Sequence, residues 1–142
     1  MIKKCNNSPN SLLVLSDYPT MLGRHHGGIF VKKQVDLISY YFSSIYIVSP
    51  KPIYLFRGYK SYAYRNIHVF YPRFFPLPPI DYFRKLRGDY LSWIVSSFLS
   101  RKKLCPIIIH SHFIWPYGYV GALIKNRRGL PLVITALSLI HI

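Results

Sequence analysis

Short runs of apolar, mostly β-branched residues alternate along this chain with longer segments in which apolar positions recur every three or four residues. The short runs predict five strands, at residues 11–16, 45–48, 67–70, 106–110 and 132–136. The longer segments predict three helices, at residues 29–42, 82–99 and 117–126. This alternation is typical of an α/β protein in which helices cover both faces of a parallel sheet.

Proline, glycine and charge mark where these elements end. The run from Pro72 to Pro79 is expected to be an ordered loop or linker, because its prolines fix φ and lack N–H donors. Asp81 is placed to cap the helix that follows, and the cations at 101–103 favour the dipole at its end. Gly129 is placed to cap the last helix.

Composition narrows the class of protein. The 142 residues are 51% hydrophobic, which is too apolar for a disordered basic tail and allows one packed domain. With 19 Lys and Arg against 4 Asp and Glu, the net charge is +15. Such charge between aromatic side chains could bind nucleic acid or an anionic membrane surface. However, most cations fall on predicted helix faces and ends, and no RNP, KH or helix-turn-helix pattern is present.

Three further features are not indicated: a transmembrane helix, a signal peptide, and a zinc site or disulfide scaffold. The uncharged stretch 104–124 is long enough to cross a bilayer, but its prolines, glycines and histidines argue against a transmembrane helix. Residues 1–10 lack the apolar run of a signal peptide, so we expect the chain to stay in the cytoplasm. Cys5 and Cys105 lack the spacing of a zinc site or a disulfide scaffold, and we expect inert thiols.

The first candidate site is Gly27-Gly28, immediately before the first predicted helix. Glycine lets a ligand approach the backbone, and free N–H groups at a helix start attract phosphate or carboxylate. Arg24, His25 and His26 would add donors. The alternative is a tight strand-to-helix turn, since the segment is neither a GxGxxG nor a Walker loop.

The second candidate site is His110-Ser111-His112, at the carboxyl end of the fourth predicted strand. Ligands of open α/β sheets bind outside the carboxyl ends of the strands. Alternation places His110 and His112 on one face and Ser111 on the other. A metal site would need a third ligand, for which Asp17 is the nearest suitable residue. The alternative is a histidine pair satisfied by local hydrogen bonds.

The order of motifs resembles the amino-terminal domain of family 4 glycosyltransferases over about 12–136. The matching pieces are the Gly-Gly loop, a strand ending in Ser-Pro-x-Pro, Ile-Ile-His-Ser-His-Phe-x-x-Pro-x-Gly-x-x-Gly-Ala, and Leu-Pro-Leu-Val-Ile-Thr-Ala. The resemblance implies a GT-B fold of two Rossmann-like domains. It also implies retaining transfer of a sugar, without metal or other cofactor, from a nucleotide-sugar donor to a lipid-linked or carbohydrate acceptor.

Residue by residue, the resemblance carries over only in part. It places Gly27 and Gly28 at the donor phosphates and His112 near the cleft between the domains. The histidine that the family has after Thr-Ala is replaced by Leu137, and the two glutamates of the donor-binding domain have no counterpart, because the chain contains no glutamate. Residues 1–136 are therefore interpreted as an acceptor-side domain whose carboxyl-terminal, donor-binding domain is missing.

The last six residues, 137–142, correspond to the translation of a transposon-end sequencing adapter, and we interpret them as an artefact; the alternative is a divergent natural strand end. On this interpretation the fragment is inactive alone and belongs to an enzyme of polysaccharide biosynthesis in the cytoplasm, in contact with the inner face of an anionic membrane and not with nucleic acid.

Two rival interpretations stay open. One is a small basic protein that binds nucleic acid or a membrane surface. The other is a separate Rossmann-like enzyme, which would need an acidic residue where Ser49-Pro50 stands. For the restored enzyme, Gly28→Val is expected to lower transfer at least about tenfold without changing the melting temperature. His112→Ala is expected to do the same if His112 faces the cleft, whereas with a structural His112 it is expected to lower stability instead.

Overall fold

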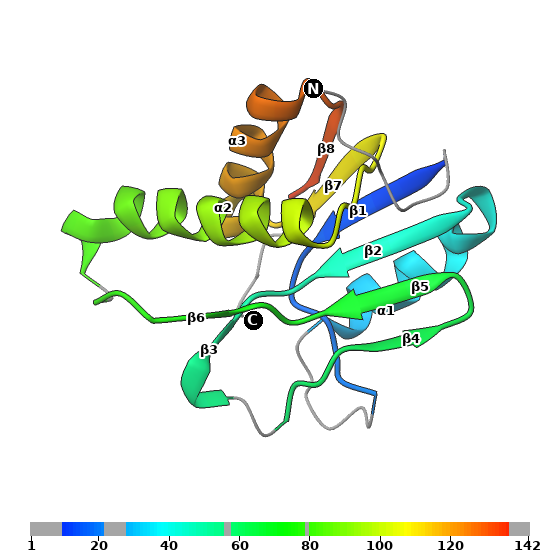
Figure 1. Cartoon of the computed structure of the whole chain (residues 1–142), viewed down its shortest axis with the longest axis horizontal. Helices are drawn as coiled ribbons and strands as arrows, with labels where there is room; N and C mark the ends of the chain where they lie inside the picture. The colour runs from blue at the N-terminus through cyan, green and yellow to red at the C-terminus, as the bar shows by residue number, and fades with distance from the viewer. Residues whose placement is uncertain (1–9, 22–27, 56–57, 79, 137–142) are drawn as a thin grey trace.

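A six-stranded sheet with the order β4-β5-β2-β1-β7-β8 organises the molecule (Figure 1). The computed structural model describes residues 10–21, 28–55, 58–78 and 80–136. The parallel strands are β1 (Ser11–Leu15), β2 (Ser44–Val48), β5 (Ile67–Phe70), β7 (Ile108–His112) and β8 (Leu132–Thr135). At one edge, β4 (Tyr62–Tyr64) pairs with β5 in the antiparallel direction. The predicted α/β class, with a Rossmann-like open sheet, is therefore confirmed.

In the described ranges, three α-helices connect these strands. They are α1 (Ile29–Ile38), α2 (Arg84–Arg101) and α3 (Tyr119–Arg128). Short helical turns lie beside them: η1 (Ser39–Tyr41) after α1, η3 (Asp81–Phe83) before α2, and η4 (Ile114–Gly118) before α3. Beyond the carboxyl ends of β2 and β5, β3 (Lys51–Pro52) pairs with β6 (Arg73–Phe74), and η2 (Ile53–Leu55) follows β3.

The alternation of side chains along β1 divides the core into two layers. Leu12 and Val14 face α1, where they pack with Val31 and Val35. Leu13 and Leu15 face the opposite side, which α2 and α3 cover. Because both faces are covered, all five residues of β1 are buried, as the continuous apolar run predicts. Figure 1 shows α1 on one side of the sheet and the other two helices on the other.

The structure also corrects details of the sequence analysis. Asp81 does not cap α2: it begins η3, and neither η3 nor α2 has a side-chain cap at its start. Gly129 does cap α3 as predicted, with a φ of 67°. Cys105 is not a free thiol, because it is disulfide-bonded; Cys5 lies outside the described residues. In the described ranges, no helix combines the length and apolar character needed to cross a membrane.

Candidate functional site

Polar residues gather where the parallel strands end. Asp17 follows β1, His112 closes β7, and Thr135 closes β8. The register brings these ends together, since Leu15 lies opposite Ser111 and His112 lies opposite Thr135. The carboxyl edge of the sheet is therefore the candidate functional site, which is where open α/β sheets bind ligands.

The two histidines share one face of β7, as predicted. Their ring centroids lie 4.3 Å apart, and His110 Nε2 lies 2.7 Å from Thr135 Oγ1. His112 has no exposed surface, and neither of its ring nitrogens has a hydrogen-bond partner. Hence the alternative of a locally satisfied pair holds for His110 and not for His112. An unbonded, buried imidazole is unusual, because it loses its contacts with water without replacement.

Burial keeps both imidazoles neutral near pH 7. It lowers the pKa of His110 from its usual 6.5. Burial, together with the neighbouring His110 ring, lowers the pKa of His112 to about 4. A neutral imidazole has one N–H donor and one acceptor nitrogen. His112 therefore carries no positive charge that would attract a phosphate, and its imidazole lies beneath the open surface of the site.

A second cluster centres on Asp17. Its Oδ1 accepts hydrogen bonds from the Tyr117 hydroxyl at 2.9 Å and from Lys51 Nζ at 3.1 Å. The Asp17 side chain is 49% exposed, so it is open to a ligand, whereas Tyr117 is buried. Burial and the Asp17 carboxylate raise the pKa of Tyr117, which stays a hydrogen-bond donor.

The sequence suggests Asp17 only as a third metal ligand beside the two histidines. Among the residues that the structure describes, no three His, Cys, Asp or Glu side chains lie close enough together to hold a metal ion. The role of Asp17 as the centre of a hydrogen-bonded cluster was missed. Its position directly beyond the first strand was the available signal, but Tyr117 lies 100 residues away in the sequence.

Gly28 lies at the junction of the site and α1. Its φ is +85°, and a Cβ there would stand 2.3 Å from the carbonyl oxygen of Asp17. The glycine is thus needed to form the strand-to-helix turn, which is the alternative considered above. For the same reason, the expectation that Gly28→Val leaves the melting temperature unchanged is wrong. Gly27, with Arg24, His25 and His26, lies outside the described residues, and the phosphate role of Gly27-Gly28 stays a prediction.

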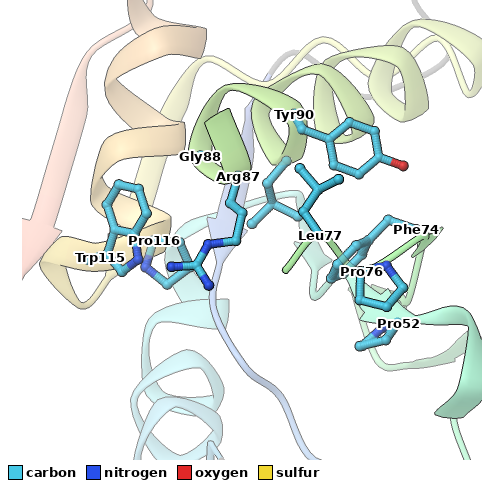
Figure 2. A pocket seen from close by; sticks show the side chains of 10 residues that line it. Pro52, Phe74, Pro76, Leu77, Arg87, Gly88, Tyr90, Trp115 and Pro116 are labelled. Carbon is cyan, nitrogen blue, oxygen red and sulfur yellow. The ribbon is translucent and has the colours of Figure 1, made fainter. Parts of the chain in front are cut away.

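A pocket of about 310 Å³ opens beyond the same edge (Figure 2). Its walls come from the β3–β6 pair, the proline-rich segment, the first half of α2 and the turn before α3. The lining residues are Pro52, Phe74, Pro76, Leu77, Arg87, Gly88, Tyr90, Leu91, Trp115 and Pro116. Arg84 lies over the Trp115 ring, with 4.8 Å between its guanidinium carbon and the ring centroid. The prolines of 72–79 predict a loop or linker, but nothing in the sequence indicates that this segment forms a pocket wall.

Phe113, between His112 and the turn, has a φ of 72° and a ψ of 144°. This conformation is strained for a residue with a side chain. Two backbone hydrogen bonds hold it: Phe113 donates to Thr135 at 2.8 Å, and Gly118 donates to Phe113 at 3.0 Å. The strained turn directs the chain from β7 past the pocket and into α3.

The fold and this edge together define an α/β protein of the Rossmann-like type, with a polar cluster and an apolar pocket side by side at the carboxyl ends of its strands. No family model matches the chain. It is 27% identical over 82 residues to an uncharacterized glycosyltransferase of Methanocaldococcus jannaschii. The match covers 55% of this chain and 20% of the relative, so the chain spans about a fifth of the relative's length. The match supports a distant glycosyltransferase-like relationship.

Proposed function

We propose that this chain is the amino-terminal, acceptor-side domain of a family 4 glycosyltransferase with the GT-B fold. The observation that carries the proposal is the match to a glycosyltransferase. The arrangement of the site supports it, because a polar cluster and a pocket lie together at the edge where such a sheet binds its ligand. The donor is a nucleotide-sugar, and the acceptor is lipid-linked or carbohydrate.

In the proposed reaction, the bond between the sugar and the nucleotide diphosphate breaks, and a bond to an acceptor oxygen forms with retention at the sugar. The nucleotide diphosphate leaves with the bonding electrons and takes up the proton of the acceptor hydroxyl. Asp17 is exposed enough to accept a hydrogen bond from the acceptor hydroxyl, and Lys51 and Tyr117 fix its orientation. A contact between His112 and a sugar hydroxyl would require the segment over it to open, because its side chain has no exposed surface. Backbone N–H groups at the start of α1 would face the donor phosphates.

The transfer needs groups from a second domain, because this half supplies positioning and hydrogen bonds on one wall of a cleft only. We therefore propose that the native gene continues past Ala136 into a donor-binding domain, and that residues 137–142 derive from an adapter. The mechanism proposed here uses no metal and no cofactor beyond the nucleotide-sugar itself.

Sequencing the gene by a transposon-free method tests the first part of this proposal. The reading frame is expected to continue past codon 136; recovery of the same six residues followed by a stop codon would contradict it. The longer product is then assayed with radiolabelled UDP- and GDP-sugars, alongside the 142-residue chain as the matched control. Transfer by the longer product alone is expected, and transfer by the short chain would refute the half-enzyme interpretation.

One observation favours a second role at a membrane surface. The turn before α2 exposes Tyr82 at 87%, and α2 itself exposes Leu86 at 53% and Trp93 at 57%. Arg84 and Lys85 lie between Tyr82 and Leu86 in the sequence. Exposed aromatic and apolar side chains between cations suit the headgroup region of an anionic bilayer. The chain should cosediment with phosphatidylglycerol vesicles and not with phosphatidylcholine vesicles. Equal binding to both would remove the electrostatic part of the proposal.

A further inference from the structure

The pocket beside the Asp17 cluster is built from apolar side chains with one cation. Three prolines, two leucines and the rings of Phe74 and Trp115 form most of its wall. Arg87 is the charged residue of the lining. Figure 2 shows the Arg87 side chain extending from α2 into the space between Trp115 and Pro116 on one side and Leu77 on the other.

No carboxylate belongs to this lining. The nearest one along the chain is Asp89, which is already bound: it accepts hydrogen bonds from the Tyr119 hydroxyl at 2.5 Å and from Lys85 Nζ at 3.3 Å. In the described part of the chain, no ion pair joins Arg87 to a carboxylate. The guanidinium of Arg87 therefore remains available for an anionic ligand, and the neighbouring Arg84 adds a second positive charge over Trp115.

The pocket also has a fixed relation to the polar cluster. Lys51 and Tyr117, which both bond Asp17, are the chain neighbours of Pro52 and Pro116, which line the pocket. The segments that line the pocket are therefore continuous in the chain with the two residues that bond Asp17.

An apolar track leads from the pocket to the surface. Tyr90 belongs to the lining, and its ring stacks on Trp93 with centroids 6.3 Å apart. Trp93 is 57% exposed. Figure 2 shows the hydroxyl of Tyr90 pointing away from Arg87. A long apolar chain could follow these rings outward, whereas a sugar ring would find few partners for its hydroxyls among the lining residues.

We propose that this pocket binds a lipid phosphate: Arg87 binds the phosphate, and the apolar wall holds the first part of the hydrocarbon chain. The inference rests on the proposed function and narrows it, because it selects a lipid-linked acceptor over a free carbohydrate. The volume of about 310 Å³ lies at the lower end of the range for small-molecule sites, which suits part of a chain and not a whole lipid.

Tryptophan fluorescence of the full chain tests this proposal. The chain has two tryptophans, so Trp93→Phe leaves Trp115 in the pocket wall as the sole reporter. In this variant, the Trp115 emission should change as farnesyl phosphate is added below its critical micelle concentration, and the change should reach a plateau as the site fills. Farnesol should bind about tenfold more weakly, because it lacks the charge that Arg87 recognises. Inorganic phosphate and glucose 1-phosphate should give no change at the same concentrations.

Two variants locate the ligand. Arg87→Gln should weaken farnesyl phosphate about tenfold and leave farnesol unchanged. Arg101→Gln, at the far end of the same helix, removes the same charge outside the pocket and should have no effect. Leu77→Glu places a carboxylate in the lining and should abolish binding of both ligands, while circular dichroism verifies that each variant is folded.

Three outcomes would overturn the inference. The first is that Arg87→Gln and Arg101→Gln weaken farnesyl phosphate binding equally. The second is that glucose 1-phosphate binds more strongly than farnesyl phosphate. The third is that the Trp115 emission responds to lipid vesicles but not to monomeric farnesyl phosphate. The last would indicate docking on a bilayer instead of a pocket. Transfer by the longer gene product to a water-soluble acceptor, without farnesyl phosphate binding, would overturn the lipid site and leave the proposed function standing. Saturable binding of farnesyl phosphate by a longer gene product that transfers no sugar would support the lipid site and overturn the proposed function.

Discussion

At the scale of single residues, two glycines with positive φ differ in how closely their surroundings approach them. A substitution at Gly129 costs backbone strain only, whereas one at Gly28 also causes a steric clash. A Cβ at Gly129 would meet nothing within 4 Å, whereas one at Gly28 would meet backbone atoms of Asp17 and Tyr18 at 2.3–2.9 Å. Gly129→Ala should therefore lower the free energy of unfolding by about 1 kcal/mol, from the left-handed conformation alone. Gly28→Ala should lower it by at least about 2–3 kcal/mol. Urea unfolding of both variants measures the difference, and equal losses would mean that the turn after β1 can shift.

The buried His112 makes stability depend on pH. Its pKa is about 4 in the folded chain and about 6.5 when unfolded, so the unfolded chain binds the proton more readily between these values. Stability is full above pH 6.5 and is lost as the pH falls toward 4. Between about pH 7.5 and about pH 5, this residue should remove about 2 kcal/mol, at roughly 1.4 kcal/mol per unit. The lowered pKa of His110 acts in the same direction.

His112→Leu isolates that contribution. The variant should unfold with nearly the wild-type free energy at about pH 7.5, because it exchanges an imidazole with no hydrogen bonds for an apolar side chain of similar size. Its loss of stability on acidification should be smaller than that of the wild type by about 2 kcal/mol. Urea unfolding at the two pH values provides the measurement. An unchanged acid loss would show that His112 is not the group that titrates.

At the level of elements, the antiparallel edge strand β4 is attached by tyrosine hydroxyls. The Tyr64 hydroxyl donates to Asp36 of α1 at 2.8 Å and is also bonded to the hydroxyl of Tyr18, which is buried. Tyr64→Phe should lower the free energy of unfolding by about 1–3 kcal/mol, because it leaves the Tyr18 hydroxyl buried without this partner. Tyr40→Phe, at an 80% exposed position, is the matched control and should have almost no effect. Similar melting temperatures for the two variants would contradict this account of the edge.

Elements that bury a run of apolar residues could be predicted from the sequence. Elements that are held by side-chain hydrogen bonds could not. β1, β2, β5, β7 and β8 are confirmed as strands because their apolar runs lie in a covered parallel sheet. The bounds predicted for the fourth strand, 106–110, are wrong, because β7 runs from Ile108 to His112. β4 has only three residues and is attached through side-chain hydroxyls, which leave no periodic pattern. Asp81 has a residue type suited to capping, but the chain enters α2 through an extra helical turn that displaces it.

The candidate site was predicted in part for a similar reason. The shared face of His110 and His112 follows from the period of a strand and was confirmed. The bond between Asp17 and Tyr117 depends on tertiary structure and has no local signal. The pocket likewise combines four segments, none of which has a ligand-binding motif of its own.

For the whole molecule, the charge of +15 on 142 residues is a source of self-repulsion in the compact state. Raising the ionic strength from about 20 mM to about 300 mM should screen it and raise the melting temperature by about 2–4 °C, equivalent to about 1 kcal/mol. NaCl and KCl should give coincident curves, because screening depends on ionic strength and not on the cation. A melting temperature that is independent of salt would show that the charges are too dispersed to matter.

The order of the strands also determines when the sheet can be completed during synthesis. β1 lies between β2 and β7, so one of its edges stays unpaired until the ribosome has released nearly all of the domain. The bond from Tyr117 to Asp17 spans 100 residues, which takes on the order of 5–20 s to translate. During that interval a strand with four apolar residues, Leu12 to Leu15, presents an open hydrogen-bonding edge. The nascent chain is therefore an expected client of ribosome-associated chaperones, and slower translation would lengthen its exposure to aggregation.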